Sequence, residues 1–149
     1  MKKIIFTQIL LLSVLGNYAQ NKLYDASSIP EEMKKNANSV IREERIEFEV
    51  RSVNKASYKM HKVVTVLDEN GKDELEFHEF TDQFRSLESA AIQLFNSKGY
   101  GLQKYKRSDL SKQIAGEGLV PDDKVYFIKF PPQNYPVTMV IDYEIKYTG

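Results

Sequence analysis

Two histidines and a scatter of carboxylates are the side chains with which this sequence could perform chemistry. The chain contains no cysteine, which excludes cysteine nucleophiles, thiolate metal sites and redox dithiols. A serine nucleophile needs a histidine base, but neither His61 nor His78 lies near a Gly-x-Ser-x-Gly motif, which the sequence lacks. We therefore expect a protein that is not an enzyme and has no catalytic residue.

The two histidines could still hold a metal ion if they lie on one pair of strands. Asn70-Gly71 is typical of a two-residue hairpin turn, and the register that it sets would place His61 and His78 diagonally on one face, with Glu76 beside them. Two imidazoles and a carboxylate form a ligand set for zinc or iron. The simpler interpretation is that both histidines are ordinary residues of a half-exposed strand face. We favour it, and expect no metal and no cofactor.

Acidic and glycine-rich stretches do not match known ion or phosphate sites. Adjacent acids such as Asp73-Glu74 and Asp122-Asp123 point to opposite faces of a strand, and neither stretch has the spacing of a calcium loop. Gly116-Glu117-Gly118 lacks the following helix and the lysine of a phosphate-binding loop. We interpret these stretches as solvated turns.

Aromatic residues could line a surface for a glycan or a peptide, because tyrosine combines a large contact area with a polar group. At alternating strand spacing, however, most of them are expected to be core residues or cross-strand pairs. The candidates are Tyr100, Tyr105, Tyr126, Phe127, Phe130, Tyr135, Tyr143 and Tyr147.

The first 19 residues have the composition of a cleavable export signal. Lys2 and Lys3 precede an apolar run over residues 4–15, and cleavage after Ala19 would leave Gln20 as the new N-terminus. The run is shorter than the about 20 apolar residues that span a membrane, so we expect no membrane anchor after cleavage. The sequence predicts a protein exported to the periplasm, the cell envelope or the extracellular space.

The remaining chain is predicted to be one domain that folds without disulfides. Its 42% hydrophobic and 11% aromatic composition can supply a core, and its roughly 130 residues suit a single domain. Once Lys2 and Lys3 are removed, the 21 acidic side chains slightly outnumber the basic ones. That balance argues against a nucleic-acid partner.

The first elements expected after a flexible lead-in over residues 20–28 are a short helix and a strand. Ser28-Ile29-Pro30-Glu31 combines a capping serine with an acid three residues later, which predicts a helix over residues 29–36. Alternation then begins at residue 39 and predicts a half-buried strand. Its apolar face would hold Val40, Ile46, Phe48 and Val50.

A second strand over residues 56–67 is expected to form the most reliable hairpin of the chain through Asn70-Gly71. The register sets Val66 opposite Leu75, Val64 opposite Phe77 and Lys62 opposite Glu79.

Four further strands are expected, over residues 85–95, 100–105, 124–130 and 135–147. Within residues 85–95, Leu87, Ala91 and Leu94 would also fit a helical stripe, but the turn-like residues 96–99 favour a hairpin of the first two strands. Residues 108–110 and 115–123 would form loops. The last strand places Met139, Ile141, Tyr143, Ile145 and Tyr147 on one side. Six or seven strands and one helix predict a mainly β, two-layer antiparallel sandwich over residues 29–149. A long strand at the end of the chain suggests a neighbour beyond Gly149, and so a domain that is incomplete here.

Several segments resemble a known family. They are Ser28-Ile29-Pro30-Glu31, Lys35-Asn36-Ala37-Asn38-Ser39-Val40-Ile41-Arg42, Asn70-Gly71, Asp122-Asp123-Lys124-Val125 and Tyr135-Pro136. Together they resemble the domain of unknown function that precedes transglutaminase-like domains in secreted proteins of Gram-negative bacteria. In that family the pattern continues into more β structure and a domain with a papain-like Cys-His-Asp arrangement, which this chain lacks.

The resemblance implies a non-catalytic, exported accessory module that packs against or positions a transglutaminase-like domain. It supplies no catalytic residue to this chain. The alternative is a free-standing module that binds a glycan or a peptide through an aromatic surface.

Overall fold

The computed structural model describes residues 23–114, 123–131 and 133–149. The predicted export signal, the Gly116-Glu117-Gly118 stretch and Asp122 lie outside these residues. No helix within the described part of the chain is long and apolar enough to cross a membrane.

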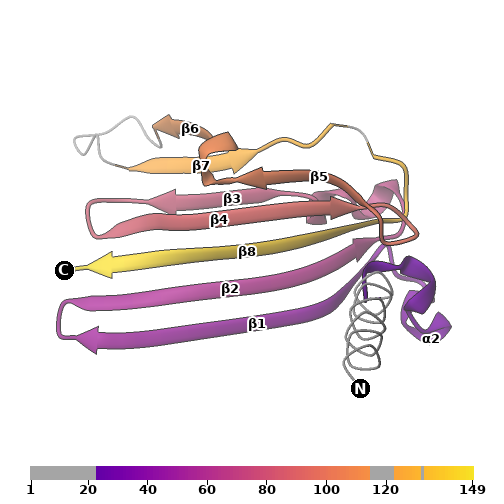
Figure 1. Cartoon of the computed structure of the whole chain (residues 1–149), viewed down its shortest axis with the longest axis horizontal. Coiled ribbons are helices and arrows are strands. Elements are labelled where there is room, and N and C mark those ends of the chain that lie inside the picture. Colours follow the sequence, from indigo (N-terminus) through magenta and orange to yellow (C-terminus); the bar gives the residue numbers. More distant parts are fainter. Residues whose placement is uncertain (1–22, 115–122, 132) are drawn as a thin grey trace, which may run out of the picture.

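The larger of two sheets is antiparallel and has five strands in the order β1-β2-β8-β4-β5 (Figure 1). Its strands are β1 (Ser39–Ser52), β2 (Lys55–Val66), β4 (Arg85–Phe95), β5 (Gly101–Lys106) and β8 (Val137–Thr148). A second antiparallel sheet has three short strands in the order β3-β7-β6. These are β3 (Phe77–Thr81), β6 (Ser111–Ile114) and β7 (Lys124–Ile128). The predicted mainly β, two-sheet antiparallel fold is confirmed.

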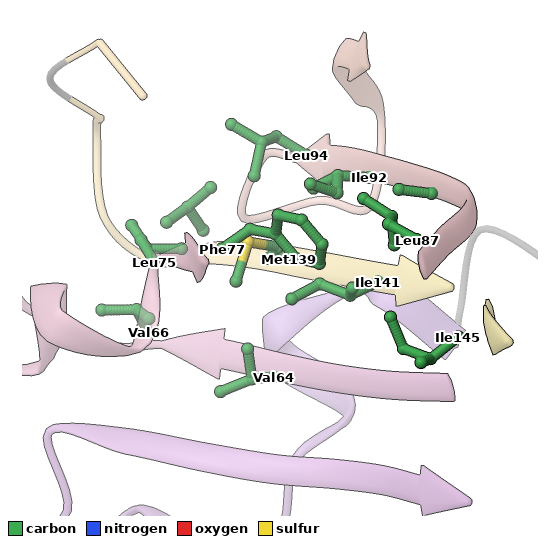
Figure 2. Packing of buried hydrophobic residues seen from close by; sticks show 12 residues of the cluster. Val64, Val66, Leu75, Phe77, Leu87, Ile92, Leu94, Met139, Ile141 and Ile145 are labelled. Atoms are coloured by element: carbon green, nitrogen blue, oxygen red, sulfur yellow. The ribbon is translucent and has the colours of Figure 1, made fainter. Parts of the chain in front are cut away.

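The hydrophobic core lies between the two sheets. Alternation along β8 buries Met139, Ile141 and Ile145, as the sequence predicts, because these side chains point toward the small sheet. Figure 2 shows how they meet apolar side chains from β2, β3, β4 and the segment before β3. The partners include Val64, Val66, Leu75, Phe77, Leu87, Ile92 and Leu94.

The hairpin predicted at Asn70-Gly71 is wrong. Residues Glu69–Glu74 form the 3₁₀ helix η2, so the chain leaves the large sheet after β2 and enters the small sheet at β3. The Asp68 side chain accepts a hydrogen bond from Asn70 N at 2.8 Å and so caps η2. Gly71 is buried against the backbone of Asn38, where a Cβ atom would lie 2.4 Å from the carbonyl oxygen. The glycine serves this close approach rather than a two-residue turn.

The pairs that this hairpin would have formed are accordingly absent or changed. Val66 and Leu75, like Val64 and Phe77, belong to the same core but lie in different elements. Lys62 binds Glu74, with 2.9 Å between Nζ and Oε2, instead of Glu79. The first hairpin is formed by β1 and β2, whose register ends at Ser52 opposite Lys55.

The short helix and the second hairpin are largely as expected. Helix α2 covers Glu31–Lys34, and Asn36 ends the segment in the left-handed region with φ of 62°. Ser28 does not cap it, because its Oγ donates to Asp25 O in the preceding 3₁₀ turn η1 (Ala26–Ser28). The hairpin of β4 and β5 is confirmed, and the Asn96 side chain accepts hydrogen bonds from two backbone nitrogens of its turn.

Strand β8 is the central strand of the large sheet. It pairs with β2 on one side and with β4 on the other along nearly its whole length. Both neighbours of this last strand thus lie within the described part of the chain. Local alternation shows that a segment is a strand, but it carries no information on which strands lie beside it.

Two smaller predictions also differ from the structure. Residues 107–109 form the 3₁₀ helix η3 (Arg107–Asp109), and the strand β6 that follows was not expected. The single apolar face predicted for β1 is wrong. The register shifts between Ile41 and Glu43, so buried Val40 lies on the opposite face from Ile46, Phe48 and Val50, which are exposed.

Candidate functional site

The structure separates the two histidines that the sequence places together. His61 lies on β2 in the large sheet, whereas His78 lies on β3 in the small sheet, opposite Phe127. The metal site drawn from His61, His78 and Glu76 is therefore wrong. Within the described residues, no group of three or more histidines and carboxylates could hold a metal ion.

His61 instead joins three strands of the large sheet through carboxylates. Its Nδ1 lies 2.7 Å from Asp142 Oδ1 on β8, and its Nε2 lies 3.8 Å from Glu43 Oε2 on β1. The three residues belong to the face of the large sheet that points away from the small sheet. Because Nε2 faces a carboxylate rather than a hydroxyl, the arrangement differs from that of a nucleophile with its base.

A shallow depression of about 330 Å³ surrounds this histidine. Its lining carries charges of both signs, from Arg45, Glu47, Lys59, Asp142 and Glu144. Mixed charges on an open sheet face are also what a solvated surface needs. The depression therefore does not by itself indicate a ligand.

A larger cavity of about 650 Å³ lies at the end of the small sheet, next to η2. Its apolar lining includes Phe77, Phe127, Phe130 and Tyr135, and Lys72 and Lys129 are among its charged residues. Three of the eight aromatic residues singled out in the sequence thus border one cavity.

Most of the other aromatic candidates pack against the core. Tyr105, Tyr126, Tyr143 and Tyr147 are half-buried there. Tyr100 is 58% exposed. The eight residues therefore do not form one continuous binding face.

The most conspicuous exposed apolar feature is a row of side chains on β1. Ile46, Phe48 and Val50, which we call the β1 stripe, are 53%, 61% and 67% exposed. Across the sheet, each of them lies level with one residue of β8 on the far side of β2. These β8 residues are Tyr143, Ile145 and Tyr147, in the same order. The β1 stripe therefore points to the same side as the small sheet, which does not cover it.

A buried ion pair lies at the margin of the small sheet, where the small sheet stops covering the large one. Glu79 on β3 is only 7% exposed, and the Arg85 guanidinium donates hydrogen bonds to its carboxylate and to Phe80 O. Burial, followed by the neighbouring Glu79 carboxylate and Tyr58, raises the pKa of Tyr143 well above its usual range. The Phe48 ring meets the Tyr147 ring edge-on, with 6.0 Å between centroids, so the β1 stripe directly adjoins this margin.

Comparison with known proteins reveals the fold and little more. No protein-family model matches the chain, and no curated protein matches it. The chain is similar to the crystal structure of a "putative protease" from Parabacteroides distasonis ATCC 8503, with a TM-score of 0.62 and 11% sequence identity. The match covers 74% of this chain and 23% of that one, so the chain spans less than a quarter of that protein. At this identity the likeness establishes a shared fold alone.

Proposed function

We propose that this chain is a non-catalytic, exported accessory module that packs through the β1 stripe against a transglutaminase-like domain. The observation that carries the proposal is the exposure of Ile46, Phe48 and Val50 on a sheet face whose other part is covered. Contiguous apolar side chains left in solvent are typical of interaction surfaces. Covering the β1 stripe would extend the existing core rather than create a separate contact.

Two further observations support a catalytic domain as the occupant. The family that the sequence resembles places this kind of module before a domain with a papain-like Cys-His-Asp arrangement. The fold also occurs as less than a quarter of a larger protein whose description names a protease. This chain has no cysteine, so such chemistry would have to come from the neighbouring domain.

The genomic reading frame beyond codon 149 tests the proposal first. We expect it to continue into a domain with a cysteine, a histidine and an aspartate of papain-like order. A stop codon directly after Gly149, together with a stable monomer, would contradict the packing role.

A pair of substitutions in the intact protein tests the surface itself. Phe48→Ser should weaken the packing of the two domains, seen as faster amide hydrogen exchange in β1 and loss of a single cooperative unfolding transition. Lys59→Ser is the matched control, because Lys59 is exposed on the neighbouring strand β2 and points to the opposite, charged face of the sheet. Equal effects of the two substitutions would exclude the β1 stripe as the docking surface.

The cavity next to η2 favours a second candidate function, the binding of a glycan or a peptide. It combines a substantial volume with the aromatic residues Phe77, Phe127, Phe130 and Tyr135, as ligand sites do. Titration with peptidoglycan fragments should shift the NMR signals of Phe127 and Tyr135, and Phe127→Ser should abolish the shifts. Unchanged spectra at millimolar concentrations of the fragments would exclude the cavity as a glycan- or peptide-binding site.

A further inference from the structure

Strand β1 has an open edge as well as an open face. It pairs with β2 on one side, and within the described residues no strand pairs with its other side. Its register with β2 is regular from Glu43 to Val50, so this stretch offers a straight row of unpaired backbone groups. Such an edge can accept another strand.

The side chains along this edge carry an unusual order of charges. On the face away from the small sheet the order is Glu43, Arg45, Glu47 and Glu49. Arg51 follows at the register irregularity between Val50 and Ser52, where its guanidinium donates hydrogen bonds to Glu49 Oε2. Except for half-buried Glu43, these residues are exposed. Residues at equal distances on the two sides of Glu47 carry opposite charges. Arg45 corresponds to Glu49, and Glu43 corresponds to Arg51. The row is therefore complementary to its own reversed copy.

Two copies of β1 can pair antiparallel about a two-fold axis normal to the sheet. Each charged residue then lies opposite its counterpart in the second copy. In the register centred on Glu47, Arg45 lies opposite Glu49 of the second copy, and Glu43 lies opposite its Arg51. Each of these pairs forms twice, and Glu47 alone faces a like charge. Cross-strand pairs of opposite charge stabilise a sheet and like pairs destabilise it.

The neighbouring registers fail this requirement. A register centred on Phe48 sets Arg45 opposite Arg51 and Glu47 opposite Glu49. A register centred on Ile46 sets Arg45 opposite Glu47 but also Glu43 opposite Glu49, so its repulsive pairs offset its attractive ones. On the other face, the register centred on Glu47 also sets Ile46 opposite Phe48, twice, so two exposed apolar residues of each copy come together.

We propose that the occupant of the β1 edge is a second copy of this chain, paired antiparallel through β1 in the register centred on Glu47. The two large sheets then form one continuous ten-stranded sheet. This inference does not rest on the proposed accessory role. It brings together Ile46 and Phe48 of the β1 stripe, but its register is set by the charged residues on the opposite face of β1. A paired edge of this length buries a small area, so the dimer is weak and weakens further with salt.

Sedimentation equilibrium of the chain without its first 19 residues tests the proposal. We expect a monomer–dimer equilibrium that is concentration-dependent and weaker at high salt. Arg45→Glu should weaken the dimer about tenfold or more, because two attractive pairs become repulsive. The exchanged variant with both Arg45→Glu and Glu49→Arg should restore it, and Glu47→Gln should tighten it about two- to fivefold.

Charge reversal at the opposite margin of the sheet serves as the control. Lys104→Glu on β5 leaves the β1 edge untouched and should leave the dimer unchanged. A chain that stays monomeric up to millimolar concentration would overturn the proposal and show that the charges of β1 keep the edge free. A dimer that ignores Arg45→Glu, or that the exchanged variant does not restore, would overturn it equally.

Discussion

The β1 stripe and the part of the same sheet under β3 and β7 carry side chains of the same kind in very different surroundings. Ile145 on β8 is completely buried, whereas Phe48, in the same row of the sheet two strands away, is 61% exposed. Both belong to strands with regular alternation. The difference shows that alternation determines which face of a strand is apolar, while the second layer determines whether that face is buried.

The reach of the small sheet sets the boundary between the two regions. Its strands have only four or five residues, against twelve and fourteen in β8 and β1. At its margin the core gives way to the ion pair of Glu79 and Arg85. A buried carboxylate requires a partner, so this margin is more polar than either the core or the β1 stripe.

The largest effect is expected in the covered region. Ile145→Ala should lower the free energy of unfolding by about 2–5 kcal/mol, because it removes a completely buried side chain and leaves a cavity. Chemical denaturation of the purified chain measures this directly. A loss below about 1 kcal/mol would mean that the two sheets do not pack as described.

An intermediate effect is expected at the margin. Glu79→Ala should lower the free energy of unfolding by about 1–3 kcal/mol, because it leaves the partly buried Arg85 guanidinium without its carboxylate. The same denaturation experiment applies, with Glu88→Ala as a control on an exposed pair with Lys146. If both substitutions were equally harmless, the margin would not differ from the surface.

The smallest effect on the isolated chain is expected in the β1 stripe. Val50→Ser should change the free energy of unfolding by no more than about 0.5 kcal/mol, because the side chain is already mostly in solvent. Thermal unfolding of the dilute monomer is the appropriate measurement. A large loss would show that the β1 stripe is covered in solution, and the contrast between the two regions would disappear.

The sequence predicts the strands better than their arrangement. Apolar alternation identified most strands, including the buried row of Met139, Ile141 and Ile145 on β8. It could not show that β8 lies between β2 and β4, because that pairing joins segments far apart in the chain. The hairpin predicted from Asn70-Gly71 was wrong because of another contact between segments far apart in the chain. The requirement for Gly71 comes from its approach to Asn38, a residue outside any local window.

The candidate sites were less predictable than the fold. His61 and His78 were placed together only through the wrong hairpin, and the actual partners of His61, Asp142 and Glu43, come from two other strands. The exposure of Phe48 and Val50 depends on how far the small sheet extends, which no pattern within β1 indicates. The charge order of β1, by contrast, is visible in the sequence once the strand is known to lie at an edge.

Ribosomes make a chain from its N-terminus, so the central strand of the large sheet is synthesised after both of its neighbours. Until β8 has emerged, β1 with β2 and β4 with β5 are separate hairpins, and isolated hairpins are at best marginally stable in water. Folding must then wait for contacts between distant segments, which form slowly. With this topology the large sheet cannot be completed until its last strand is available.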